Sequence, residues 1–322
     1  MSSPPLTASA LATLASYREA KILLTALKFD LFTQLVGAPQ DSATLARNIG
    51  AQDGPLRVLL DALVALGVLG YDDEHYANTT LAAEHLVRGT RFWYWAQVED
   101  AAWGDWSDLE ATIRSGHRGQ PNLYERDRAA AADLLVALSG RGWEAGELVA
   151  DRVDLCNHRR VLDLGGGSGA LSIRLCQRYP HLRATVVDLP DTLHVGRELV
   201  RQVGLAERIA FNGVDLRSAP LPLGYDVIII SQVLHWYPPA ENRRLLRRVR
   251  AASGADALLL IGEYFLGPDR THPAQAALFS VGMLVAGGGR CYTTREVTRW
   301  LEETGWQCID TIEPHAWLAA RA

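Results

Sequence analysis

Residues 161–169 read Val-Leu-Asp-Leu-Gly-Gly-Gly-Ser-Gly and are the most informative part of the sequence for the fold. Its first four residues form a short apolar run around Asp163, which is typical of a buried strand. Gly165, Gly167 and Gly169 follow, and residues without a Cβ let the backbone turn sharply and approach a ligand closely. A helical pattern comes next, and the free N–H groups at its start would face whatever the turn holds. Strand, glycine turn and helix together predict a nucleotide-binding unit.

Short apolar runs alternate with helical segments from this point towards the C-terminus. The strand-like runs are VLDL at 161–164, ATVVDL at 184–189, IAFNGVDL at 209–216, YDVIIISQVL at 225–234, ALLLIGEYFL at 257–266 and QCIDTIEP at 307–314. Strands that alternate with helices at this spacing favour a largely parallel sheet flanked by helices. We therefore expect an α/β fold with a Rossmann-like, doubly wound sheet.

The first part of the chain has a different texture and reads as mostly helical. Helical patterns are followed at 67–79 by GVLGYDDEHYANT, which has the pattern of a strand, a polar turn and a returning strand. This order is that of a winged helix. We predict a helical, winged-helix-like dimerisation domain over residues 1–141 and an α/β domain over residues 142–322.

A winged helix raises the question of DNA binding. The helix expected to read DNA, at 54–66, offers Arg57 and Asp61 among leucine, valine and alanine. Reading DNA needs several cationic side chains on an exposed face. We therefore expect this helix to be buried and to serve packing or dimerisation.

Composition limits the classes of protein further. The chain has 322 residues and a formal net charge of -5, which gives no electrostatic reason to expect a nucleic acid or an anionic membrane as partner. Its four cysteines form no CxxC pair, and nothing in the sequence indicates a metal site. Its apolar runs fall short of the ~20 residues of a membrane span. We expect a soluble, cytoplasmic protein.

The acidic residues around the glycine turn indicate which nucleotide is bound. Asp163 precedes the first glycine by two residues, where a carboxylate can hold the cationic amino group of a methionine moiety. Asp188 closes the next strand and suits hydrogen bonding to ribose hydroxyls. Asp215 follows a third strand, where it would reach adenine. The spacing G-x-G-x-G and Asp163 favour S-adenosylmethionine over a nicotinamide dinucleotide.

His235 is the candidate catalytic base. It follows the apolar strand ending near Ser231, at the edge of an open α/β sheet where ligands bind. An imidazole that titrates near neutrality can accept a proton from a reacting hydroxyl. Glu263 closes a neighbouring strand and could fix the tautomer of the imidazole. From the residues alone, a histidine bonded to backbone beside Trp236 stays an open alternative.

These motifs together resemble the class I S-adenosylmethionine-dependent small-molecule O-methyltransferases. That family includes plant caffeate and flavonoid enzymes and bacterial antibiotic-tailoring enzymes. The matching segments, in the family's order, are 14–35 (LASYREAKILLTALKFDLFTQL), 56–69 (LRVLLDALVALGVL), 161–175 (VLDLGGGSGALSIRL), 186–192 (VVDLPDT), 213–216 (GVDL) and 230–246 (ISQVLHWYPPAENRRLL). The resemblance covers nearly the whole chain and implies a homodimer that methylates a small molecule without a metal.

The resemblance also implies roles for single residues. For the cofactor, it assigns the methionine end to Asp163, Gly165, Gly167 and Gly169, the ribose to Asp188 with Leu189, the adenine region to Asp215 with Leu216, and a lining position to Ser231. It makes His235 the general base and Glu263 the acid that orients it. It places Phe279 and Met283 at the acceptor pocket, and we expect Trp236 to line that pocket as well. Ordinary helix packing is the competing interpretation for Phe279 and Met283.

Two positions depart from the family's pattern. The family usually has His-Asp-Trp or His-Asn-Trp where this chain has Trp236 directly after the histidine, and it often has a second glutamate where this chain has Cys291. The resemblance implies methylation of an aromatic or polyketide-like hydroxyl. The open alternatives are C-, N- or S-methylation, a member that retains the cofactor for a different reaction, and a ligand-sensing winged-helix regulator.

Overall fold

The computed structural model describes residues 12–118, 121, 128–312 and 317–322. Contacts along the chain divide it into two compact units, Met1–Ala101 and Ala102–Ala322. Helix α7, Arg91–Ser107, runs across this division. The predicted division after residue 141 falls within helix α10, Arg128–Arg152, and it stays a prediction.

The first unit is mainly helical and contains one small antiparallel sheet. Its elements before α7 are α2 (Tyr17–Lys28), α3 (Leu31–Gln34), α4 (Ser42–Ile49), α5 (Asp53–Ala65), β1 (Leu69–Asp72), β2 (His75–Asn78) and α6 (Thr80–His85). Asp73 and Glu74 both have positive φ, which allows the tight turn between β1 and β2. Two helices and a hairpin thus follow one another in the order that the sequence predicts.

Within one protomer, helix α5 is buried along one side only. It buries Leu56, Leu60 and Leu63 along one stripe. Its other side is open to solvent, where the Arg57 side chain is 55% exposed and Val58 is 71% exposed. One stripe of the helix thus packs within the protomer, and Val58 lies outside that stripe.

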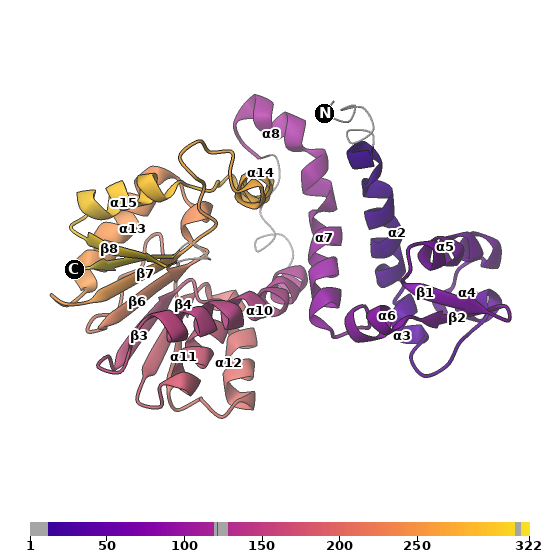
Figure 1. Ribbon diagram of the computed structural model, residues 1–322, viewed down its shortest axis with the longest axis horizontal. Coiled ribbons are helices and arrows are strands. Elements are labelled where there is room, and N and C mark those ends of the chain that lie inside the picture. Colours follow the sequence, from indigo (N-terminus) through magenta and orange to yellow (C-terminus); the bar gives the residue numbers. More distant parts are fainter. Residues whose placement is uncertain (1–11, 119–120, 122–127, 313–316) are drawn as a thin grey trace, which may run out of the picture. The chain divides into compact units, whose positions relative to one another are not determined.

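The second unit is built on a seven-stranded sheet (Figure 1). Its strands are β3 (Arg160–Leu164), β4 (Arg183–Asp188), β5 (Ile209–Gly213), β6 (Val227–Ser231), β7 (Leu258–Gly262), β8 (Gln307–Ile312) and β9 (Trp317–Arg321), in the spatial order β5-β4-β3-β6-β7-β9-β8. Strands β3 to β7 pair in parallel, and β9 pairs antiparallel with both β7 and β8. The predicted, largely parallel Rossmann-like sheet is confirmed.

Helices cover both faces of this sheet (Figure 1). Alternate side chains of β6 enter the two cores: Val227 and Ile229 pack with residues of α10 and α11, and Ile228 and Ile230 pack with residues of α13 and α15. The helices and 3₁₀ turns of this unit, besides α10, are α8 (Leu109–Ser115), α11 (Ala170–Arg178), η1 (Pro190–Thr192), α12 (Leu193–Gln202), η2 (Leu234–Trp236), α13 (Pro239–Ala252), α14 (Ala274–Gly287) and α15 (Thr294–Glu303). Among the described residues, no helix has the length and apolar content needed to cross a membrane.

The parallel strands place the predicted site residues along one edge. Because β3 to β7 run in the same direction, their carboxyl ends meet at the same side of the sheet. Asp188 and Ser231 are the last residues of β4 and β6, and Glu263 directly follows β7. Residues far apart in the sequence are thereby brought to one edge, which is where we look for the functional site.

Candidate functional site

The glycine turn after β3 adopts a backbone that favours glycine. Gly165, Gly167 and Gly169 have φ of 72°, 53° and 72°. A Cβ on Gly165 would lie 2.3 Å from Cγ2 of Val233, so a side chain there would displace the segment that leads to His235. Gly169 is the N-cap of α11, and the turn therefore delivers the free N–H groups of that helix to the sheet edge.

Asp163 lies beneath this turn and is almost completely buried, with 1% of its surface exposed. Within the described part of the chain, Ser172 Oγ is the one group that donates to its carboxylate, over 2.7 Å. Burial raises the pKa of Asp163 to about 6, against the opposing hydrogen bond from Ser172. A buried carboxylate that lacks a cation is poised to receive one from a ligand.

Asp188 is held in place by the backbone around it. Its Oδ2 accepts from the amide of Gly167 over 2.7 Å, and its Oδ1 accepts from the amide of Leu189 over 2.7 Å and from Thr192 Oγ1 over 3.2 Å. Burial raises the pKa of Asp188, and these three hydrogen bonds oppose that rise. The carboxylate is thereby fixed against the glycine turn.

The third acidic residue has a partner that the sequence did not reveal. Arg217 donates to both carboxylate oxygens of Asp215, from Nε to Oδ1 over 3.2 Å and to Oδ2 over 3.0 Å, and from Nη2 to Oδ2 over 2.8 Å. These hydrogen bonds lower the pKa of Asp215. Leu216 is 5% exposed and belongs to the core, and its backbone carbonyl accepts from Arg248 Nη1. Ser231, half-buried, pairs with Gly262 across the sheet.

The chemistry of this region fits S-adenosylmethionine. Among the described residues no cationic side chain pairs with the buried Asp163, and the cofactor's ammonium group would supply that positive charge. Asp188 is fixed beside the turn, in a position to accept from ribose hydroxyls. Gly167 leaves room above the turn: a Cβ there would lie 3.1 Å from Leu135 and 4.0 Å from Asp188 Oδ2.

His235 and Glu263 form a buried pair further along the same edge. His235 lies in η2 and is 3% exposed, and Glu263 is 7% exposed. Nδ1 of the imidazole lies 2.7 Å from Oε2 of the carboxylate. The other carboxylate oxygen, Oε1, accepts from the amides of Val233 (2.8 Å) and Leu234 (2.7 Å). One carboxylate therefore anchors both the imidazole and the backbone before it.

Aromatic side chains surround this imidazole. The ring of Phe279, from α14, meets it edge to face with centroids 5.2 Å apart, and Trp236 lies at 5.8 Å. The ring of Tyr264 packs against that of Phe279 in a tilted arrangement, with centroids 4.6 Å apart. Met283, one turn further along α14, is buried. The structure thus brings Phe279 and Trp236 to the imidazole, and adds Tyr264, which follows Glu263 directly.

Cys291 is a buried thiol near the same carboxylate. It is 1% exposed, and its backbone amide donates to Ser280 Oγ over 3.0 Å. Burial, and then the charge of Glu263, raise the pKa of the thiol to about 12. The thiol is therefore neutral near pH 7 and leaves Glu263 as the acid at the imidazole.

Several residues that support the site were given no role from the sequence. Ser172, Thr192 and Arg217 hold the three acidic residues, and Asn242 holds the turn of His235. The close spacing of Asp215 and Arg217 is the one available signal, and it is too common to be specific. Among the residues that the structure describes, no group of three or more His, Cys, Asp or Glu side chains could hold a metal ion.

Comparisons with known proteins identify both parts of the chain. The family model for the O-methyltransferase domain matches residues 122–307, and that for the O-methyltransferase dimerisation domain matches residues 7–88. Together they account for most of the sequence.

Individual relatives agree with this assignment. The chain is 32% identical to a 3-hydroxy-5-methyl-1-naphthoate 3-O-methyltransferase of Streptomyces sahachiroi, over 90% of this chain and 86% of that protein. It is 27% identical to the N,N-dimethyltransferase OxyT of Streptomyces rimosus, over 91% and 88%. The solved structure "PigF with SAH" has the same fold, with a TM-score of 0.91, 24% identity and coverage of 98% and 99%. The chain belongs to the O-methyltransferase family, with that family's dimerisation domain, and is an S-adenosylmethionine-dependent methyltransferase.

Proposed function

We propose that this enzyme methylates a hydroxyl group of an aromatic or polyketide-like small molecule, with His235 as the general base. The observation that carries the proposal is the buried pair of His235 Nδ1 and Glu263 Oε2, 2.7 Å apart, on the same sheet edge as the cofactor motifs. The naphthoate substrate in the name of the Streptomyces sahachiroi relative supports an aromatic acceptor.

The pair defines how a proton would move. Nδ1–H donates to Glu263, which leaves Nε2 as the nitrogen that takes the proton of the acceptor hydroxyl. Glu263 then stabilises the imidazolium and keeps its orientation. Because Oε1 of the same carboxylate is held by two backbone amides, neither the acid nor the ring needs to reorganise.

The cofactor residues act by binding and orientation. When bound, S-adenosylmethionine supplies an electrophilic methyl group on a sulfonium, so the protein needs no covalent intermediate. We assign the ammonium group to Asp163, the ribose to Asp188 and Leu189, the adenine region to Asp215 and the Leu216 backbone, and a lining role to Ser231 and to Gly165, Gly167 and Gly169. Holding donor and acceptor in line accounts for most of the catalysis. Phe279, Trp236 and Met283 would wall the acceptor site.

We further propose that the protein is a homodimer. The match to the dimerisation domain at residues 7–88 supports this, as do exposed apolar side chains of that segment, such as Leu14 (71% exposed) and Tyr17 (56%). Light scattering after size-exclusion chromatography should give twice the chain mass of 35.3 kDa. A monomer at micromolar concentration would contradict the proposal.

N-methylation is the second candidate, because a relative of similar coverage is an N,N-dimethyltransferase. A neutral amine loses its proton after methyl transfer and depends less on a base than a hydroxyl does. The thiol of Cys291, in place of a second carboxylate, is compatible with that lower demand.

A matched pair of acceptors separates the two candidates. Purified enzyme with S-adenosylmethionine is offered 3-hydroxy-1-naphthoate or 3-amino-1-naphthoate, along with larger hydroxylated polyketide aromatics. Release of S-adenosylhomocysteine and the mass of the product are measured. We expect O-methyl products that need His235. Methylation of the amine alone would favour the second candidate, and loss of acceptor without S-adenosylhomocysteine would contradict both.

A further inference from the structure

Several backbone carbonyls of the turn that carries His235 accept hydrogen bonds from other segments of the chain. Leu234 O accepts from Asn242 Nδ2 over 2.9 Å, and Tyr237 O accepts from the same nitrogen over 3.0 Å. His235 O accepts from the amide of Arg290 over 3.0 Å. These partners come from α13 and from the segment 288–292 that follows α14.

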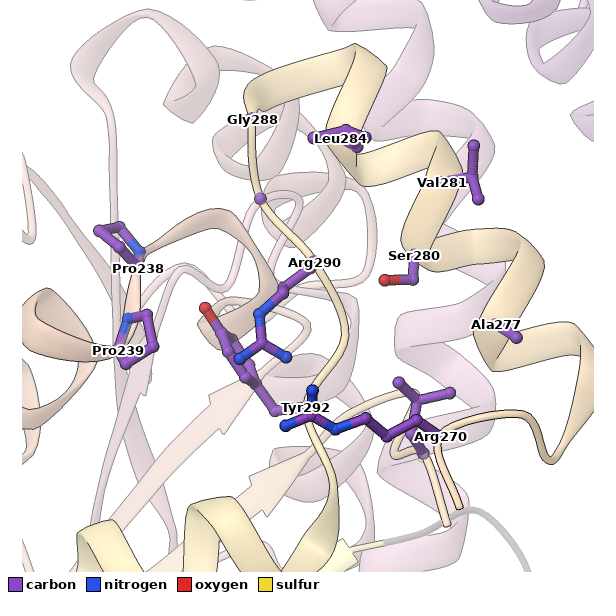
Figure 2. A pocket seen from close by; sticks show the side chains of 12 residues that line it. Pro238, Pro239, Arg270, Ala277, Ser280, Val281, Leu284, Gly288, Arg290 and Tyr292 are labelled. Carbon is purple, nitrogen blue, oxygen red and sulfur yellow. The ribbon is translucent and has the colours of Figure 1, made fainter. Parts of the chain in front are cut away.

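The backbone of the segment 288–292 lies directly against the backbone of this turn. A Cβ on Gly289 would lie 1.9 Å from His235 O and 3.0 Å from its carbonyl carbon. The obstacle is backbone, which cannot rotate away as a side chain can. Figure 2 shows the segment leaving α14 at Gly288 and passing between that helix and Pro238-Pro239 towards Tyr292.

The far side of this contact is anchored as well. Tyr292 Oη donates to Tyr237 O over 2.6 Å, and the Arg290 guanidinium donates to Glu296 Oε1 over 3.0 Å. Glu296 in turn forms the capping box of α15 with Thr293. Hydrogen bonds of Arg290 and Tyr292 thus hold the segment beside the turn.

We propose that Gly289 is a positioning residue for methyl transfer, because only a residue without a side chain lets the Arg290 amide hold the carbonyl of His235. This inference rests on the proposed role of His235 as the base. Asn242 acts on the same turn from the other side, and it is fully buried. With a thiol at position 291, Glu263 is the acid that holds the imidazole, so its contact depends on where this backbone lies.

The expected effect of misplacing the turn is on rate and not on cofactor binding. A shift of about 1 Å at a catalytic group can cost roughly 100-fold in rate. We expect Gly289→Ala to lower kcat about 100-fold, with the Kd for S-adenosylhomocysteine within about twofold of wild type. Asn242→Leu, which keeps the volume and removes the donor, should lower kcat about tenfold.

The experiment measures three properties of wild type, Gly289→Ala, Asn242→Leu, His235→Ala and the control Gly254→Ala. A Cβ on Gly254 would meet nothing within 4 Å. The properties are S-adenosylhomocysteine binding, the kcat and KM for the first phenol of the acceptor panel that wild type methylates, and the Nδ1–H resonance of His235 in 15N-histidine-labelled enzyme saturated with S-adenosylhomocysteine. The Nδ1–H resonance reports on the imidazole itself, and it therefore distinguishes a displaced base from a disturbed acceptor site.

Each outcome has a distinct meaning. A shifted or lost Nδ1–H signal and a reduced kcat in Gly289→Ala, with normal binding and a normal control, support the proposal. A wild-type signal in Gly289→Ala overturns it. Should that variant fail to bind S-adenosylhomocysteine at all, the signal and kcat of Asn242→Leu decide. Full activity of His235→Ala would instead refute the base, whatever Gly289→Ala does.

Discussion

The two halves of the candidate site differ in where their supporting groups come from. Around the glycine turn, Asp163 is held by Ser172, nine residues away, and Gly167 donates to Asp188, 21 residues away. Around His235, Glu263 is 28 residues away, and the amide of Arg290 reaches across from beyond α14. In the cofactor half, Asp163, the glycine turn and Asp188 thus lie within one βαβ unit, β3-α11-β4, whereas the base half depends on how several elements pack.

The two halves differ in charge as well. Asp163 is buried without a cation among the described residues, so its raised pKa reflects a charge that the ligand would neutralise. His235 has Glu263 at 2.7 Å before any ligand arrives. The cofactor half therefore needs its ligand to be complete, and the base half is already assembled.

Removing His235 should have the greatest effect on the rate of methyl transfer, and it changes only the base half. We expect His235→Ala to lower the rate of methyl transfer by about 10²–10⁴-fold, because general-base assistance contributes that much. Single-turnover kinetics at saturating S-adenosylmethionine measure the rate without product release. Glu263→Gln, which keeps a hydrogen-bond acceptor and removes the charge, should be intermediate. A His235→Ala rate within threefold of wild type would remove the base from the mechanism.

The pH dependence of cofactor affinity is a more modest effect, and it tests the cofactor half. Because burial raises the pKa of Asp163 to about 6, the free protein loses this negative charge as the pH falls through 6. Affinity for the ammonium-bearing S-adenosylhomocysteine should therefore be constant above about pH 7 and fall about tenfold per pH unit below 6. Calorimetric titration from pH 7.5 to 5 measures this slope.

Asp163→Asn is the control for that pH dependence. The pKa of Asp188 is also raised by burial, so both carboxylates could contribute. Asn at position 163 should weaken binding at every pH and reduce the slope. An unchanged slope in that variant would assign the titration to Asp188.

The smallest expected effect concerns Cys291. Its thiol is buried and has a pKa of about 12, so it carries no charge that could assist the imidazole. Cys291→Ala should change kcat by less than about threefold, since it removes a small apolar group. Iodoacetamide at pH 8 should leave Cys291 unlabelled in the folded protein, as peptide mass spectrometry would show. Rapid labelling there, or a 100-fold loss of kcat in Cys291→Ala, would contradict this view.

The same comparison explains how much could be predicted from the sequence. Strand β3, the glycine turn and Asp188 could be predicted, because apolar runs, glycines and carboxylates at strand ends are recognisable from neighbouring residues alone. The parallel sheet follows from the alternation of strands and helices. Which side of α5 packs within the protomer is harder to predict, because leucine, valine and alanine occur around the whole helix.

The supporting contacts could not be predicted for a physical reason. Gly289 against His235 depends on backbone that approaches only after the sheet and α14 have packed. Arg217 on Asp215 and Asn242 under η2 are close in sequence, but such pairs are too common to be specific. The amide of Arg290 carries no sequence signal, since every residue except proline has one.

The claim that the two halves do separate work is tested most directly by calorimetric titration of S-adenosylhomocysteine into wild type, Asp188→Ala and His235→Ala under one set of conditions. We predict that His235→Ala binds within about twofold of wild type and that Asp188→Ala binds about 100-fold more weakly, because it loses charge-assisted hydrogen bonds to the ligand. Binding lost equally in both variants would show that the halves are one unit. A folded, ligand-free wild type that binds nothing would contradict the assignment of the glycine turn as the cofactor site.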